Sequence, residues 1–362
     1  MRTADRRPQT AENRPPTAEN RPQTADGGPR TADDQPHPAV GRRPSAVGGQ
    51  NLAVGGRPSA VGFLGDWLVS EYIYTPAGDY VGVVRQRRRL QPLAAGKIRV
   101  IQICEPVETA VNLSPKGEQV AAIMNKRVGE FVFDLQLAGR ARHYLGPDVI
   151  GGGFSWREGA LTARGLWPGF GCNFTSFSIL LNPERQVTGG KFFVANEEIA
   201  AIVGAAVPEA QGYPEMTADR RPPTAEELTA DRRPPTAVNY AGYQGHRYFI
   251  APDGELVETA AINDYGRIAQ EINDAPGREK WYGPLREVEA VTGPGETLSL
   301  IEIHDPAARA IAGLGKRFRD EKLRGVELYI LTADGGRPTA EDDPPTNVGG
   351  LRSAVRGQRT NP

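Results

Sequence analysis

Apolar and polar residues alternate along much of the chain between residues 63 and 331. Residues 130–137, for example, read EFVFDLQL, with an apolar side chain at every second position. Successive side chains of a strand point to opposite faces, so this pattern predicts a strand with one buried face. The same signal predicts further strands at 66–75, 80–90, 97–104, 140–145, 159–166, 173–181 and 187–194, and then at 246–251, 255–262, 285–292, 297–303 and 325–331.

Short turn-forming sequences separate these segments, among them PAGD at 76–79, Asn182-Pro183 and Gly189-Gly190. Many short strands joined by tight turns favour an antiparallel barrel or sandwich over a parallel α/β sheet. We therefore expect a mostly β fold, with a barrel followed by a second, smaller β-rich half.

Helix signals are few. Ser114 followed by Pro115 is typical of a helix N-terminus, and Gly129 lies just beyond the predicted end. Two further helices are predicted at 196–202, with an asparagine as its cap, and at 305–322, which opens with Asp-Pro. The last of these would be the helix of the second half.

A seven-residue repeat occupies the parts of the chain that lack aromatic residues. From Thr3 the chain reads TADRRPQ, TAENRPP, TAENRPQ, and the same words return within 217–239 and after residue 331. Each unit contains proline, which a helix interior excludes, so the period does not indicate a coiled coil. The repeats have too little apolar surface to offset the entropy of ordering, which predicts disorder. They are either a passively translated DNA repeat or a linker that binds a partner.

The repeats divide the chain into five predicted segments. These are a disordered tail at 1–61, a β-barrel domain at 62–215, a disordered insert at 216–238, a second β-rich domain or half at 239–331, and a disordered tail at 332–362.

Charge and composition exclude several classes of function. Outside the repeats at 1–61, 217–237 and 332–362 the chain has 30 acidic and 26 basic side chains, which argues against a nucleic-acid-binding surface. No stretch approaches the length of a membrane-spanning helix and no signal-peptide core is present, so we expect a cytoplasmic protein. In the reducing environment of the cytoplasm, Cys104 and Cys172 are expected to be buried thiols.

The chain carries no motif for a metal or a cofactor. His143, His246 and His304 are isolated from one another, and no cysteine pair has ligand spacing. We therefore expect neither a metal nor a cofactor. Asp148 near His143 is the only candidate acid–base pair that the spacing suggests.

The first predicted strand begins Gly65-Asp66-Trp67. This tripeptide, the strand pattern of residues 62–194, and a late helix before a final strand (305–331) resemble the lipocalin and wider calycin group. The resemblance implies a barrel that encloses a small, usually apolar molecule. It also implies that Trp67 closes the floor of the barrel, a structural role.

The densest candidate site is a run of aromatic residues separated by glycines between residues 143 and 178. Glycine lets the backbone approach a ligand, and an aromatic lining with a few polar groups is the usual makeup of a ligand pocket. Polar groups are expected from this region and from the arginine run at 85–89. The predicted ligand-binding residues are Trp156, Trp167, Phe174, Phe177, Arg88, His143, Tyr144 and Arg185. The alternative is that the aromatic side chains simply fill a core.

Three functions remain open on this evidence. The first is binding of a small hydrophobic or amphipathic molecule in the barrel, including one that carries a carboxylate. The second is an enzyme, an isomerase, cyclase, hydratase or lyase, in which His143, Tyr144 or Arg185 moves a proton or stabilises charge. The third is a structural or assembly factor with a filled barrel.

Overall fold

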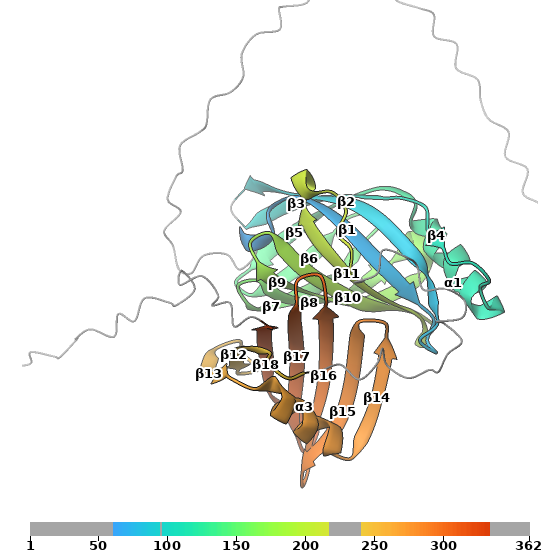
Figure 1. Ribbon diagram of the computed structural model, residues 1–362. Helices are drawn as coiled ribbons and strands as arrows, with labels where there is room; N and C mark the ends of the chain where they lie inside the picture. Colours follow the sequence, from blue (N-terminus) through green and yellow to red (C-terminus); the bar gives the residue numbers. More distant parts are fainter. Residues whose placement is uncertain (1–60, 95, 217–239, 334–362) are drawn as a thin grey trace, which may run out of the picture. The chain divides into compact units, whose positions relative to one another are not determined.

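The computed structural model describes residues 61–94, 96–216 and 240–333 (Figure 1). The repeat tails and the insert that we predict to be disordered fall almost entirely outside these residues, so their state and the domain boundaries stay predictions. Within the described residues the strands form two antiparallel sheets, one of eleven strands and one of seven.

The larger sheet closes into a barrel, because β1 pairs with both β2 and β11. Ten strands make the wall: β1 (Gly65–Tyr74), β2 (Tyr80–Ala94), β3 (Lys97–Cys104), β5 (Gly129–Ala138), β6 (Ala141–Leu145), β7 (Ile150–Arg157), β8 (Ala160–Trp167), β9 (Cys172–Asn182), β10 (Arg185–Val194) and β11 (Glu197–Pro208). The short β4 (Glu108–Thr109) pairs with β2 outside this ring. Closure leaves the ten-stranded wall without an open edge. The expected lipocalin-like antiparallel barrel is confirmed, with ten strands in place of eight.

Trp67 is buried, as the lipocalin resemblance implied. Its indole N–H donates to the carbonyl of Phe63 at 3.1 Å, in the short 3-10 helix η1 (Val61–Phe63). The side chain belongs to the hydrophobic cluster that fills the barrel, so its role here is structural.

The helix predicted after Ser114 is present as α1 (Pro115–Met124), continued by the 3-10 helix η2 (Asn125–Arg127). The Ser114 side chain accepts a hydrogen bond from the Gly117 N–H, which satisfies one free donor of the first turn. Val120 and Met124 belong to the same cluster as the barrel interior, so the apolar face of α1 extends the barrel core.

Two other predicted helices are wrong. Residues 197–208 form β11, in which every residue from Ile199 to Val207 is buried. A continuous apolar run is typical of a strand covered on both faces and cannot be told from a buried helix by periodicity alone. Residues 310–319 form β17, so the late helix that supported the lipocalin resemblance does not exist. Position 313 of β17 has to be glycine, because a Cβ there would collide with the ring of Tyr329 on the neighbouring strand.

The second sheet confirms the smaller β-rich half with one helix. Its order is β13 (Leu256–Ile262), β12 (Gln244–Ile250), β18 (Lys322–Thr332), β17 (Ala310–Arg319), β16 (Glu296–Asp305), β15 (Leu285–Gly293) and β14 (Gly277–Tyr282). The helix is α3 (Tyr265–Asp274), capped by Asp264, and lies outside the segment where we expected it. The described residues also contain the 3-10 helices η3 (Pro168–Phe170) and η4 (Glu209–Gln211).

The outer wall of the barrel packs against the seven-stranded sheet. One hydrophobic cluster contains Ile179, Val187 and Val203 from the barrel together with Leu314 and Leu328 from the sheet. An ion pair reinforces this contact, since Arg185 Nε donates to Asp305 Oδ2 at 2.6 Å. Strand β11 is buried on both faces, which explains its continuous apolar sequence.

Candidate functional site

The eight predicted site residues lie on two opposite faces of the barrel wall. Strand geometry separates them, because neighbouring residues of a strand face opposite sides. Trp167, Phe174, Tyr144 and Arg88 face the barrel interior, whereas Trp156, Phe177, His143 and Arg185 face outward. The structure does not bring them together on one concave surface.

The interior group is part of a packed aromatic core. The Trp167 ring lies 4.6 Å from the Phe170 ring and 5.9 Å from the Phe174 ring, between centroids. Tyr144 lies beside Phe133, and burial raises the pKa of its hydroxyl. These contacts pack the aromatic side chains against one another, as in the alternative that the sequence left open.

Two members of the outward group serve packing. The Trp156 indole N–H donates to Thr162 Oγ1 at 3.0 Å, and Arg185 is held by Asp305 of the second sheet. The other two, His143 and Phe177, line a cleft.

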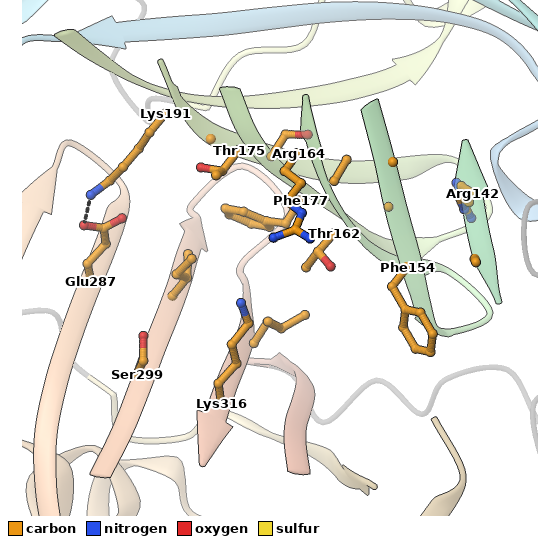
Figure 2. A pocket seen from close by; sticks show the side chains of 18 of the residues that line it. Arg142, Phe154, Thr162, Arg164, Thr175, Phe177, Lys191, Glu287, Ser299 and Lys316 are labelled. Atoms are coloured by element: carbon orange, nitrogen blue, oxygen red, sulfur yellow. Dashed lines mark hydrogen bonds and ion pairs between the residues drawn. The ribbon is translucent and has the colours of Figure 1, made fainter. Parts of the chain in front are cut away.

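This cleft lies between the outer barrel wall and the seven-stranded sheet and has a volume of about 640 Å³. Barrel strands β6 to β10 form one wall and β15 to β17 the other (Figure 2). Its apolar surface comes from Phe154, Phe177, Leu285, Ile301 and Leu314. Pockets of roughly 300 to 1,000 Å³ with mostly apolar walls are the usual size for small-molecule ligands.

Two cations without an acidic partner reach into the cleft. Figure 2 shows Arg164 of the barrel and Lys316 of the sheet extending into the space between the two walls. Within the described part of the chain neither forms an ion pair, whereas nearby Lys191 is held by Glu287 at 2.6 Å and Glu198 at 3.0 Å. Burial, and then the charge of Arg164, lower the pKa of Lys316. The cleft therefore combines apolar walls with uncompensated positive charge.

Arg164 and Lys316 were not among the predicted site residues. Arg164 follows Thr162 at the spacing of one strand face, a signal that could have placed it outward on the barrel. Lys316 lies in the segment that was predicted as a helix, so its strand face could not be assigned.

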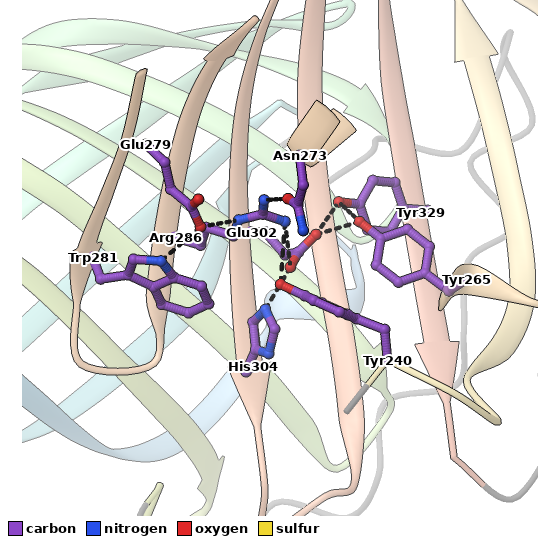
Figure 3. A network of polar contacts seen from close by, with 9 residues as sticks. All are labelled: Tyr240, Tyr265, Asn273, Glu279, Trp281, Arg286, Glu302, His304 and Tyr329. Atoms are coloured by element: carbon purple, nitrogen blue, oxygen red, sulfur yellow. Dashed lines mark hydrogen bonds and ion pairs between the residues drawn. The ribbon is translucent and has the colours of Figure 1, made fainter. Parts of the chain in front are cut away.

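A second dense polar cluster lies on the seven-stranded sheet and surrounds the fully buried Glu302 (Figure 3). Its carboxylate accepts hydrogen bonds from the hydroxyls of Tyr265 and Tyr329 and contacts His304 Nε2. Arg286 Nη1 lies 3.8 Å away. Burial alone would raise the pKa of Glu302, but the contacts with His304 and Arg286 and the tyrosine hydrogen bond lower it to about 2.

The partners of Glu302 are themselves held. Arg286 also donates to Glu279 at 2.8 Å and to the hydroxyl of Tyr240 at 3.1 Å, and it contacts Asn273. The network joins α3 and the segment at residue 240 to the sheet. Since its groups already have partners, we assign it a structural role.

No protein-family model matches the chain, and no curated protein matches it either. Similar solved structures include an S-type phycobiliprotein lyase from Guillardia theta, with 10% identity over 41% of this chain and 88% of that chain and a TM-score of 0.30. A protein of unknown function from the DUF3598 family of Nostoc punctiforme has 11% identity over 76% of this chain and 97% of that chain, with a TM-score of 0.39. A redesigned β-barrel bound to DFHBI has 9% identity over 42% of this chain and 99% of that chain, with a TM-score of 0.23. At these values the matches carry no argument about a ligand.

Proposed function

We propose that this protein binds a small amphipathic anion in the cleft between the barrel wall and the seven-stranded sheet. The observation that carries the proposal is the pair Arg164 and Lys316, two cations from opposite walls without an acidic partner among the described residues. An acid group of the ligand would lie between them, and its apolar body would lie against residues such as Phe177 and Leu314.

The proposal keeps the expected class of ligand but moves its site from the barrel interior to the outer wall. The described part of the chain has no helix of the length and apolar character needed to cross a membrane. We include in this proposal that the protein is cytoplasmic and takes up its ligand from the cytoplasm.

Binding is favoured over catalysis because the three side chains considered for proton transfer do not meet. His143 lines the cleft, Tyr144 faces the barrel interior, and Arg185 is paired with Asp305. General acid–base catalysis needs such groups within hydrogen-bond reach of one reacting centre. A filled barrel that serves as a scaffold is compatible with a binding cleft on its outside.

A pair of fluorescent dyes tests the charge requirement. Anilinonaphthalene sulfonate and neutral phenylnaphthylamine have similar apolar bodies and differ in the sulfonate group. We expect the full-length protein to bind the sulfonate about a hundredfold more tightly, as two charge-assisted contacts of about 1.4 kcal/mol each would give.

Variants locate the binding. Lys316→Met and Arg164→Gln are each expected to weaken sulfonate binding by about tenfold and to leave the neutral dye unaffected. The matched controls Lys322→Met and Arg324→Gln change exposed cations of the adjacent strand, outside the cleft lining. Equal affinity for the two dyes, or equal losses in cleft and control variants, would contradict the proposal.

A further inference from the structure

Glu71, on β1, is a buried carboxylate inside the barrel, with an exposed fraction of 2%. It accepts hydrogen bonds from Gln86 of β2, from Arg88 Nη2 at 3.5 Å and from Arg127 Nη2 at 3.2 Å. Gly204 of β11 makes room for it, since a Cβ there would lie 3.1 Å from Cγ of Glu71. The carboxylate oxygens therefore contact Gln86 and the two arginines.

Positive charge exceeds negative charge at this point. Two guanidinium groups meet one carboxylate, and Glu71 is the only buried acidic residue in the described part of the barrel. Arg127 is 3% exposed, so water does not screen its charge. An unbalanced buried cation costs several kcal/mol unless an anion accompanies it.

Three hydrogen-bond donors at the same place have no partner. They are Nε and Nη1 of Arg127 and the indole Nε1 of Trp167, all buried. The Arg127 guanidinium lies 4.9 Å from the Trp167 ring centre and 5.1 Å from that of Phe192. The guanidinium lies over the indole ring, so the three donors belong to two side chains that are in contact. Buried donors without a partner are rare in folded proteins.

We propose that Arg127 and Trp167 bind a carboxylate inside the barrel. All the free groups are donors and the local charge is positive, so the complementary ligand is an acceptor with negative charge, and a planar carboxylate suits a guanidinium best. This site is separate from the cleft, since it lies on the opposite face of the wall. It takes either a free small acid or the acid end of a longer apolar chain.

Indole NMR signals of the full-length protein test the site directly. The chain has four tryptophans, and Trp167→Phe identifies the Trp167 signal by its loss. We expect acetate, added at constant ionic strength, to shift that signal saturably and the other three little. Octanoate binding at least tenfold more tightly than acetate would assign the acid end of an apolar chain, and equal affinities would assign a free small acid.

Arg127→Gln is expected to weaken carboxylate binding by at least tenfold, and Arg127→Lys, which keeps the charge but has fewer donors, by a smaller factor. Lys126→Gln is the matched control, because Lys126 is the exposed neighbour in the same 3-10 helix. The proposal is overturned if acetate leaves the Trp167 signal unshifted, if chloride shifts it equally, or if Lys126→Gln weakens binding as much as the Arg127 variants. Dye binding in the cleft reports on the other proposal and is expected to be unchanged in all of them.

Discussion

Glu71 and Glu302 are both buried carboxylates on β-sheets, and their surroundings differ in one respect. On the seven-stranded sheet, the two tyrosines and the arginine that contact Glu302 have further partners of their own, and no buried donor among the described residues of this network lacks a partner. The polar groups around Glu71 in the barrel leave three donors free and one positive charge unbalanced. A complete network rigidifies the fold, whereas surplus donors leave capacity to bind. Charge balance and free donors thus distinguish the two carboxylates better than burial does.

The largest expected effect is the loss of the complete network. Glu302→Gln should lower the free energy of unfolding by about 3–5 kcal/mol, because it removes the buried negative charge beside Arg286 and leaves one acceptor oxygen in place of two. Urea denaturation measures the change. Glu296→Gln, on the same strand but partly exposed and paired with Arg319, is the control and should cost less than about 1 kcal/mol. Similar values for the two variants would show that the Glu302 network does not stabilise the sheet.

Acid should weaken the same network. The folded-state pKa of Glu302 is about 2, below its ordinary value of 4.5. A carboxylate with a lowered pKa stabilises the fold fully above pH 4.5 and loses this contribution as the pH falls toward 2. The shift corresponds to about 3 kcal/mol. The unfolding free energy of the parent protein should therefore fall more steeply over this range than that of Glu302→Gln, and parallel pH profiles would refute the assignment.

The network around Glu71, which has free donors, should respond differently when its carboxylate is replaced by an amide. Glu71→Gln is expected to cost about 2 kcal/mol in a buffer without small acids, because the amide oxygen still accepts a hydrogen bond and Arg88 is also held by Gln86. Added acetate should recover part of this loss by supplying the missing negative charge. It should recover none of the loss in Glu302→Gln, and equal recovery in both variants would indicate a general effect of the salt.

Much of the fold could be predicted from the sequence, because alternation reports directly on strands that have one buried face. The pattern at 130–137 corresponds to β5, and the capping signal at Ser114 corresponds to α1. The segments at 197–208 and 310–319 could not be assigned, because strands buried on both faces lose that alternation. Their environment depends on the contact between the two sheets, which no local pattern encodes.

The candidate sites were harder to predict for the same reason. His143 and Phe177 were expected to bind a ligand and do line the cleft, but the opposite wall comes from residues more than a hundred positions later in the chain. The interior site depends on Arg127, which follows α1 in a 3-10 helix and reaches Glu71 of the first strand. A single arginine at the end of a short helix carries no signal of this contact in the sequence.

The smallest expected effect is a difference in stability between variants of two tryptophans, Trp156 and Trp167, which differ mainly in one hydrogen bond. Trp156 and Trp167 are similarly buried, at 8% and 7% exposed, but the Trp156 N–H donates to Thr162 while the Trp167 N–H has no partner. Both variants to Phe remove a similar volume, so that cost should largely cancel in the comparison. Without small acids, Trp156→Phe should therefore cost about 1 kcal/mol more than Trp167→Phe, the usual value of one hydrogen bond.

Acetate turns this difference into a test of the barrel site. When a carboxylate accepts the Trp167 N–H, loss of that indole should cost more, so the gap between the two variants should narrow as acetate saturates the parent protein. Thermal unfolding of the two variants and the parent protein, with and without acetate, measures the gap. A gap that stays at its original size would mean that the Trp167 N–H gains no partner from the acid. The surplus donors around Glu71 would then be a tolerated defect of packing, and the contrast with Glu302 would be one of stability alone.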